Sequence, residues 1–209
     1  MKQILCFGDS NTHGFIPENR GRLPYDQRWP GILAERFHGK VHIIDEGHSG
    51  RTTAMEDPTA PYRSGLDFIG SCLECHKPLD GIIIMLGTND CKTFYGVSVD
   101  TIAANLEKIV CRIKVHDQTV KNNTKIIIAP PVPMDERVDG VWNQDKSSIE
   151  KSRQLSAAYE AVAKREGVYF VDPGQWGVEL TWDGCHYSAA GHLTFADRME
   201  QYLTDLFEL

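Results

Sequence analysis

The stretch Gly81-Ile82-Ile83-Ile84-Met85-Leu86-Gly87-Thr88-Asn89-Asp90 decides the fold, because an unbroken apolar run ends there in a glycine turn with polar side chains. Consecutive apolar residues are typical of a strand that is covered on both faces, as in parallel sheets. Four further short apolar runs occupy residues 3–7, 41–45, 125–129 and 168–171. Together the five runs predict a five-stranded parallel sheet.

Longer amphipathic segments separate these runs. In one of them the apolar residues recur at helical spacing: Ile102, Leu106, Ile109, Val110 and Ile113. Ser98 or Asp100 is a suitable N-cap for that helix. Similar spacing predicts helices over residues 155–162 and 193–206, and weaker patterns cover 29–37 and 66–75. Alternating strands and helices predict an α/β protein, a doubly wound three-layer α/β/α sandwich that forms one domain over residues 1–209.

Composition limits the partners of this domain. The chain carries 22 Lys and Arg against 29 Asp and Glu, a net charge of -7. Clustered basic residues are absent from the sequence, so we expect neither nucleic acid nor a membrane surface as a partner. No apolar segment approaches the roughly 18 residues of a membrane span, and the apolar run at residues 4–7 is too short for a signal peptide. We therefore expect a cytoplasmic protein.

The six cysteines have irregular spacing, which argues against a disulfide framework. Cys72 and Cys75 form a lone C-x-x-C motif with no second pair and no histidines at ligand spacing. We therefore expect reduced, structural thiols, as is usual in the cytoplasm.

Glycines and reactive side chains follow the predicted strands, at the edge where α/β sheets bind ligands. The segments are Gly8-Asp9-Ser10, Ser49-Gly50-Arg51-Thr52-Thr53, Gly87-Thr88-Asn89-Asp90 and Asp183-Gly184-Cys185-His186. Acyl transfer needs a hydroxyl nucleophile, an imidazole base, a carboxylate that orients the imidazole, and donors for an oxyanion. We predict Ser10 as nucleophile, His186 as base and Asp183 as its orienting partner. The N–H groups of Ser10 and Gly50 and the side-chain amide of Asn89 would donate to the oxyanion.

In order and rough spacing, these four segments resemble the signature blocks of the SGNH (GDSL-type) hydrolase superfamily. Arg28-Trp29-Pro30-Gly31 and Pro78-Leu79-Asp80 resemble its arylesterase and acetylxylan-esterase branch. The resemblance implies a flavodoxin-like sandwich, the same triad and oxyanion donors, and no cofactor. It also implies a homo-oligomer that acts on short-chain acyl esters of sugars, aryl or alkyl alcohols through a Ser10 acyl-enzyme, by hydrolysis or acyl transfer. The chain departs from the family pattern at Asn11, His13, His48, Cys185 and Tyr187, which affects the expected acyl and alcohol preference but not the triad.

Two other functions are compatible with the residues. A metal-assisted carbohydrate deacetylase would use His13, His48 and His186 as ligands, although they lie on separate loops without a zinc-binding spacing. A non-enzymatic flavodoxin-like module would bind the phosphate of a nucleotide at the first glycine turn. That turn lacks a lysine and places Asp9 where the anion would sit.

Several single positions also allow two interpretations. Ser49 is a rival nucleophile, but Arg51 stands where a nucleophile elbow needs glycine. Arg51 itself is predicted to form a structural ion pair or a substrate contact, Asp90 to brace its loop and His192 to lie on a helix face. Residues 131–147, which include Trp142, form either a wall, lid or subunit contact of the site or an ordinary surface loop.

Overall fold

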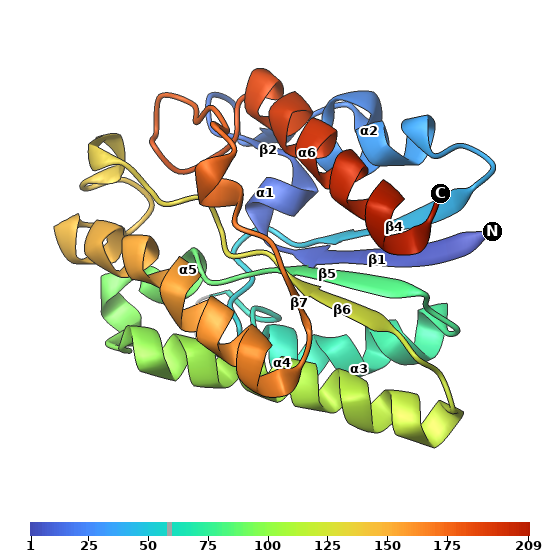
Figure 1. Cartoon of the computed structure of the whole chain (residues 1–209). Coiled ribbons are helices and arrows are strands. Elements are labelled where there is room, and N and C mark those ends of the chain that lie inside the picture. The colour runs from blue at the N-terminus through green and yellow to red at the C-terminus, as the bar shows by residue number, and fades with distance from the viewer. Residues whose placement is uncertain (58–59) are drawn as a thin grey trace.

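A five-stranded sheet runs through the middle of the computed structural model, which describes residues 1–57 and 60–209 (Figure 1). Its strands are β1 (Lys2–Gly8), β4 (Val41–Gly47), β5 (Gly81–Met85), β6 (Lys125–Ile128) and β7 (Tyr169–Phe170). They lie in the order β4-β1-β5-β6-β7, and every neighbouring pair is parallel. All five predicted strands are confirmed, although the last is only two residues long.

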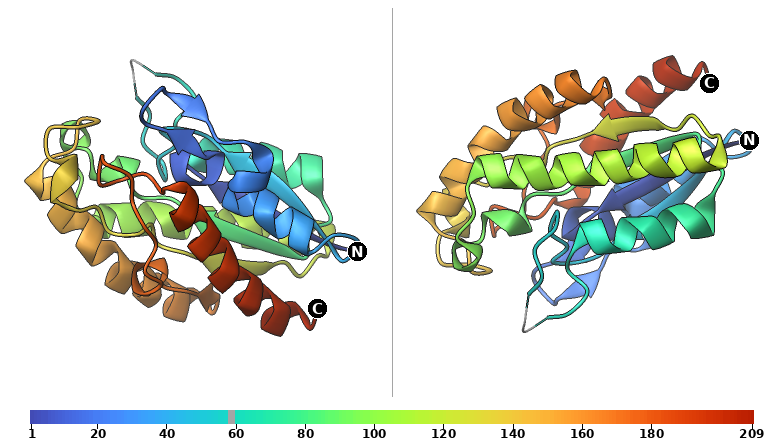
Figure 2. Two further views of the ribbon diagram at one scale, coloured as in Figure 1. Left: turned by 90° about the horizontal axis from the view of Figure 1, so that it is seen from above. Right: turned by 90° about the horizontal axis from the view of Figure 1, so that it is seen from below.

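Helices cover both faces of the sheet. α2 (Trp29–Arg36) and α6 (Ala189–Phe207) lie on one face, and α3 (Gly65–His76), α4 (Val99–Val120) and α5 (Lys146–Glu166) lie on the other (Figure 2). The helix α1 (Ser10–His13) follows β1 directly, and short 3₁₀ turns span Tyr25–Gln27, Asn89–Cys91, Thr93–Tyr95, Glu136–Val138 and Pro173–Gln175. Of the two predicted caps for α4, Ser98 is the N-cap, and its side chain accepts from the N–H of Thr101. The predicted three-layer sandwich is therefore confirmed.

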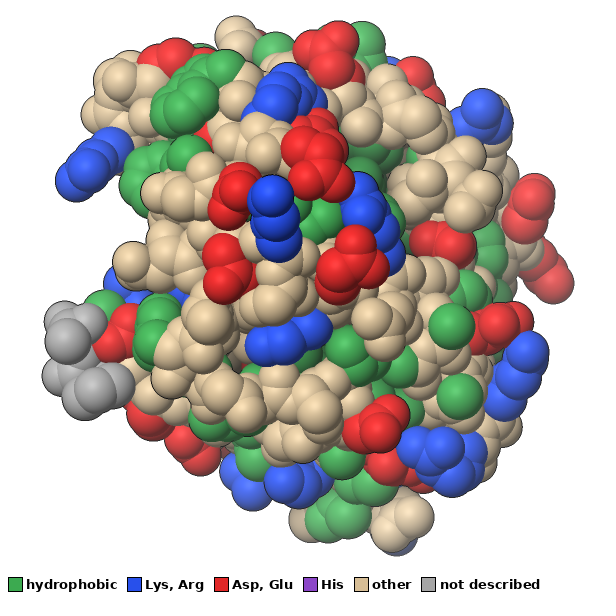
Figure 3. Space-filling model, turned by 90° about the vertical axis from the view of Figure 1, so that its left-hand side faces the viewer, with side chains coloured by type: hydrophobic (Ala, Val, Ile, Leu, Met, Phe, Trp, Pro, Cys, Tyr) green, Lys and Arg blue, Asp and Glu red, His purple; other side chains and the backbone are tan. Residues whose placement is uncertain are grey.

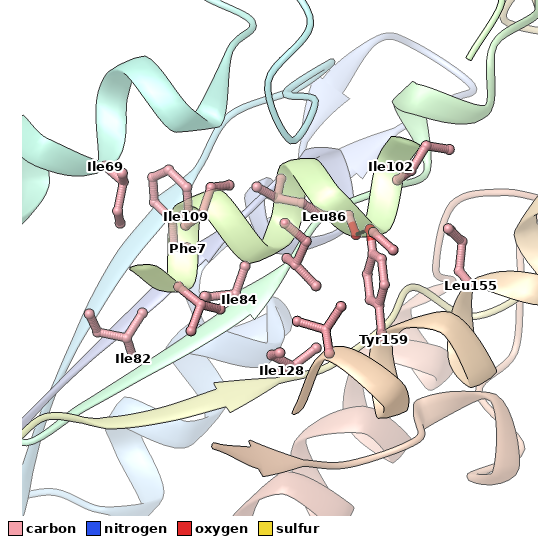
Figure 4. Packing of buried hydrophobic residues seen from close by; sticks show 14 of the residues in the cluster. Phe7, Ile69, Ile82, Ile84, Leu86, Ile102, Ile109, Ile128, Leu155 and Tyr159 are labelled. Carbon is pink, nitrogen blue, oxygen red and sulfur yellow. Dashed lines mark hydrogen bonds between the residues drawn. The ribbon is translucent and has the colours of Figure 1, made fainter. Parts of the chain in front are cut away.

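The apolar run in β5 is continuous because both of its faces are buried. Ile82 and Ile84 pack among α3, α4 and α5, whereas Ile83 and Met85 pack toward α2 and α6. Figure 4 shows the first of these clusters, in which the Tyr159 hydroxyl donates to the Leu86 carbonyl over 3.0 Å. That bond satisfies a backbone carbonyl just beyond β5, where the chain turns toward the polar loop.

A small antiparallel hairpin was not predicted from the sequence. It pairs β2 (Phe15–Ile16) with β3 (Gly21–Arg22) beside α1. Strands of two residues are too short to carry a periodic pattern, so only the folded chain reveals them.

Two expectations from composition can be compared with the described residues. None of the helices in residues 1–57 and 60–209 is both long and apolar enough to cross a membrane. All six cysteines are free thiols, and burial raises the pKa of Cys72 in the C-x-x-C motif to about 12. Such a thiol is a poor nucleophile and metal ligand at neutral pH.

Strand order places the polar loops together. β4 lies on one side of β1 and β5 on the other. The connection that follows β1 leads to β4, whereas the connection that follows β5 leads away in the opposite direction to β6. Ligand sites of open α/β sheets lie at this kind of switch point, beyond the carboxyl ends of the strands. The loops that follow β1, β4 and β5 carry Ser10, Gly50 and Asn89 respectively.

Candidate active site

Ser10, His186 and Asp183 form one hydrogen-bonded chain. The Ser10 Oγ lies 3.0 Å from the His186 Nε2, and the His186 Nδ1 lies 2.6 Å from the Asp183 Oδ2. Ser10 and His186 are each 6% exposed, and Asp183 is fully buried. The structure thus brings together the three side chains that the sequence predicted, at distances suited to proton transfer.

Ser10 owes its position to the tight turn between β1 and α1. Asp9 caps this four-residue helix, because its Oδ1 accepts from the N–H of Asn11 over 3.0 Å. Gly47 at the end of β4 lets the helix pack close, since a Cβ there would lie 2.2 Å from the backbone nitrogen of His13. The nucleophile candidate therefore stands on a short helix that is held against two strands.

Asn11 connects this helix to the loop that carries His186. Its Nδ2 donates to the Cys185 carbonyl over 3.1 Å, and its Oδ1 accepts from the Tyr187 N–H over 2.9 Å. The two bonds flank His186 on both sides along the chain. This positioning role was missed in the sequence, where the one signal was a polar residue in place of the leucine of the family pattern.

Asp183 is held by many donors. Its Oδ1 accepts from the Thr181 hydroxyl at 2.8 Å and from the N–H groups of Cys185 and His186 at 3.0 Å each. Its Oδ2 accepts from the Trp142 Nε1 at 2.8 Å besides the imidazole. Burial favours a higher pKa for Asp183, but these hydrogen bonds and the adjacent imidazole outweigh it and hold the pKa below its ordinary value. Asp183 is therefore ionised at neutral pH, the state that orients and stabilises an imidazolium.

Aromatic side chains from the β2–β3 hairpin and from segment 131–147 pack against His186. The Phe15 ring lies 4.8 Å from the imidazole and the Trp142 ring 5.9 Å, measured between centroids. Trp142 belongs to the aperiodic segment 131–147, so this segment forms a wall of the site and not an ordinary surface loop. Neither aromatic contact was predicted, because one depends on a hairpin of two-residue strands and the other on a loop whose path the sequence does not specify.

A cavity of about 240 Å³ opens over the Ser10 hydroxyl. Its lining comes from the hairpin, from the loops after β4 and β5, and from segment 131–147: Ser10, Phe15, Ser49, Gly50, Arg63, Asn89, Lys92, Trp142 and His186. All predicted site residues except Asp183 line this cavity, and Asp183 lies behind the imidazole.

The three predicted oxyanion donors meet at this cavity. Among the described residues, the N–H groups of Ser10 and Gly50 have no hydrogen-bond acceptor. Gly50 has a φ of 81°, which favours glycine at this position. The Asn89 Nδ2 donates one hydrogen to the Arg51 carbonyl over 3.1 Å, which leaves its second hydrogen available to a ligand.

Asp90 and Arg51 hold the surrounding loops together. The Asp90 carboxylate accepts from the N–H and the hydroxyl of Thr53, the loop bracing expected of it. Burial raises the pKa of Asp90 to about 6, although the Thr53 hydrogen bonds oppose that shift. Arg51 was predicted to make an ion pair or a substrate contact; the ion pair is wrong, and the substrate contact stays a prediction. Its guanidinium donates to the carbonyls of Gly8 and Glu46, and it forms no ion pair within residues 1–57 and 60–209.

The structure does not support the rival sites. The Ser49 hydroxyl is buried with no partner in the described chain, so no base activates it. His13 contacts the Gly47 carbonyl and His48 faces Arg63, and no set of three or more metal-binding side chains gathers in the part of the chain that is described. Asp9 already caps α1, where a phosphate would have to bind.

His192 lies on a helix face, as predicted. It is 1% exposed on α6, and its Nδ1 accepts from the backbone N–H of Trp29 over 3.4 Å. The imidazole therefore satisfies one of the free N–H groups at the start of α2.

Known proteins were compared with this chain by sequence and by structure. The GDSL-like lipase/acylhydrolase family matches residues 6–193. Est24, a carbohydrate acetylesterase from Sinorhizobium meliloti, is 33% identical, with a TM-score of 0.92 over 99% of this chain and 100% of its own. The inhibitor-bound aryl esterase of M. smegmatis is 31% identical, with a TM-score of 0.91 over 99% and 100% of the two chains. No curated protein sequence matches significantly. The family match spans most of the sequence and includes the segments that carry Ser10 and His186, and so the chain belongs to the GDSL-like lipase/acylhydrolase family.

Proposed function

We propose that this carboxylic ester hydrolase works through a Ser10 acyl-enzyme. The Ser10 Oγ attacks the ester carbonyl carbon while its proton passes to the His186 Nε2. The carbonyl oxygen becomes an oxyanion that accepts from the Ser10 and Gly50 N–H groups and the Asn89 amide. The bond to the alcohol oxygen then breaks, and His186 returns the proton to that leaving oxygen. Water or a second alcohol attacks the acyl group by the same route and regenerates Ser10.

One observation carries this proposal: the unbroken chain from the Ser10 hydroxyl through His186 to Asp183, at the floor of a cavity with unpaired N–H groups. Serine catalysis requires a nucleophile that is hydrogen-bonded to a base, together with a third group that orients the base. Neither rival function uses this arrangement.

We further propose that the acyl group is short. The cavity of about 240 Å³ is smaller than a typical site for a drug-sized ligand. The similar proteins act on carbohydrate acetates and aryl esters according to their names. We therefore propose acetyl and other short-chain esters of sugars, aryl or alkyl alcohols as substrates, with Phe15 and Trp142 as aromatic walls of the cavity.

A serine-directed phosphonate tests the mechanism. We expect one covalent adduct on Ser10, mapped by mass spectrometry, and none in Ser10→Ala. Ser49→Ala is the matched control, because Ser49 lines the same cavity without a base. An adduct on Ser49, or nitrophenyl acetate turnover that survives Ser10→Ala, would refute the assignment. Turnover is expected to fall from acetyl through butyryl to octanoyl nitrophenyl esters.

We also propose that the protein acts in the cytoplasm, as one domain over residues 1–209, within a homo-oligomer. The free thiols support the first point, since such thiols persist in reducing compartments. The oligomer rests on the family resemblance. Cell fractionation tests the location, and light scattering after size exclusion tests the assembly, where a mass near 23.5 kDa would contradict it.

A further inference from the structure

Two basic side chains line the catalytic cavity without acidic neighbours in its wall. Arg63 comes from the loop before α3, and Lys92 follows Asn89 by three positions. Neither an aspartate nor a glutamate is among the described residues of the lining. This is unusual for a chain with a net charge of -7, in which acidic side chains outnumber basic ones.

The charges of both side chains lack ion-pair partners. Within residues 1–57 and 60–209, the Lys92 ammonium forms no hydrogen bond and no ion pair. The Arg63 guanidinium donates to the Ser49 carbonyl and lies 3.4 Å from the His48 Nδ1, but it pairs with no carboxylate in the same set of residues.

Some of the basic side chains on the surface near the carboxyl ends of the strands are paired. Arg137 bonds to Asp135 at 2.6 Å, and Arg153 bonds to Glu136 at 2.9 Å. Figure 3 shows this side of the molecule, where basic and acidic side chains mostly lie next to each other. Arg63 and Lys92 thus differ from Arg137 and Arg153 in lining the catalytic cavity without an ion pair to a carboxylate among the described residues.

Burial makes a positive charge without an ion-pair partner costly. Both side chains are partly buried, and burial lowers the pKa of Lys92, with the Arg63 charge adding to the shift. Burial also lowers the pKa of His48, and the charges of Arg51 and Arg63 lower it further. Asp57 and Asp9 oppose the shift at Lys92 but do not cancel it. A carboxylate brought by a ligand would relieve the repulsion and gain charge-assisted hydrogen bonds.

The two cations flank the oxyanion donors. The Arg63 guanidinium packs against Gly50, because a Cβ on that glycine would lie 3.0 Å from the Arg63 Cζ. Lys92 follows directly on the 3₁₀ turn Asn89–Cys91 that begins with the Asn89 donor. A carboxylate held here would therefore lie within a few atoms of the ester carbonyl that Ser10 attacks.

We propose that Arg63 and Lys92 form a carboxylate-binding subsite, so that the preferred ester carries a carboxylate close to the scissile carbonyl. This proposal rests on the esterase function above and specifies its substrate class. The carboxylate could be carried by the acyl half, as in a half-ester of a dicarboxylic acid, or by the alcohol half, and the substrates below distinguish the two.

Matched pairs of substrates test the subsite by turnover. Phenyl hydrogen glutarate against phenyl methyl glutarate places the charge on the acyl half, and 4-acetoxybenzoate against its methyl ester places it on the alcohol half. After subtraction of the uncatalysed rate, we expect the charged member of at least one pair to have a kcat/KM roughly tenfold above its neutral partner. This ratio should fall toward one in Lys92→Gln and Arg63→Gln and in high salt.

Controls separate this proposal from the esterase function. Lys92 makes no bond that its loss would break, so Lys92→Gln keeps the test valid if Arg63→Gln fails to fold. Arg153→Gln, which removes a surface cation already paired with glutamates, should leave the ratio unchanged. If wild type cleaves phenyl acetate but neither pair shows a charge preference, the subsite is wrong and the esterase stands.

Calorimetric titration with glutarate tests the subsite without turnover. We expect binding that weakens roughly tenfold in Lys92→Gln and is unchanged in Arg153→Gln. Glutarate binding with equal affinity to all three proteins, or to none, would overturn the subsite. If no ester is cleaved at all, the proposed esterase function is wrong, whereas this titration still tests whether Arg63 and Lys92 bind a carboxylate.

Discussion

Asn89 is the residue whose assigned role is easiest to isolate, because its side chain contributes donors and no proton transfer. One amide hydrogen is bound to the Arg51 carbonyl and the other is available to the oxyanion. We expect Asn89→Ala to lower kcat by about 10²–10³, or ~3–4 kcal/mol, with a smaller change in KM, because the lost bond forms in the transition state. Steady-state kinetics with nitrophenyl acetate measure this, and unchanged kcat would remove Asn89 from the oxyanion hole.

Asn11 acts through the loop that it holds. Its two hydrogen bonds flank His186, so their loss allows the imidazole to shift from the Ser10 hydroxyl. We expect Asn11→Ala to lower kcat by about 10²-fold, the effect of a misplacement of about 1 Å. The kcat of Ser10→Ala should not fall further when Asn11→Ala is added. A purely structural role would instead leave kcat intact and lower only the free energy of unfolding.

At the scale of elements, segment 131–147 supplies both a wall and a hydrogen bond. The Trp142 Nε1 donates to the Asp183 Oδ2, and its ring packs against Phe15 and His186. Trp142→Phe keeps the ring surface but removes the donor, so kcat should fall about tenfold, in line with one hydrogen bond to a charged group.

A smaller side chain at the same position tests the wall. Trp142→Ala should also widen the cavity and raise octanoyl relative to acetyl turnover. Equal acyl-chain profiles for Trp142→Ala, Trp142→Phe and wild type would show that segment 131–147 does not bound the acyl group.

The secondary-structure elements differed in how well the amino-acid sequence predicted them. β1, β5 and β6 were predicted because burial on both faces leaves a continuous apolar run, whereas the edge strand β4, with His42 exposed, left only the shorter pattern Val41, Ile43 and Ile44. The hairpin of β2 and β3 left no signal, since two-residue strands depend on the neighbours that hold them. The three residues of the proposed triad could be found in the sequence because they belong to motifs with a required chemistry. Asn11 and Trp142 were missed because their partners lie 174 and 41 positions away, where no local pattern reports a contact.

The whole molecule should lose stability in acid partly through His192. Burial lowers the pKa of His192 to about 3, against about 6.5 in an unfolded chain. Below pH 6.5 the unfolded state therefore binds the extra proton, and the free energy of unfolding falls as the pH drops toward 3. Between pH 6.5 and 5 this contribution is about 2 kcal/mol.

Urea unfolding of wild type and His192→Asn at these two pH values checks this expectation. Between these two pH values, the free energy of unfolding should fall by about 2 kcal/mol less in the variant than in wild type. Comparison of the two proteins cancels the contribution of the other titrating groups. Equal pH dependence in the two proteins would contradict a neutral, buried imidazole. One cooperative transition in both curves is expected if residues 1–209 form one domain.

Ser10 is synthesised 176 residues before His186, although the two share a hydrogen bond in the finished protein. A nascent chain on the ribosome thus carries the hydroxyl long before the imidazole that we propose as its base. Prematurely terminated products that lack His186 would be inert toward cellular esters, even when their amino-terminal strands have paired. Ester cleavage consequently reports complete synthesis and assembly of the sheet edge, so an enzymatic assay would double as a quality measure for each preparation.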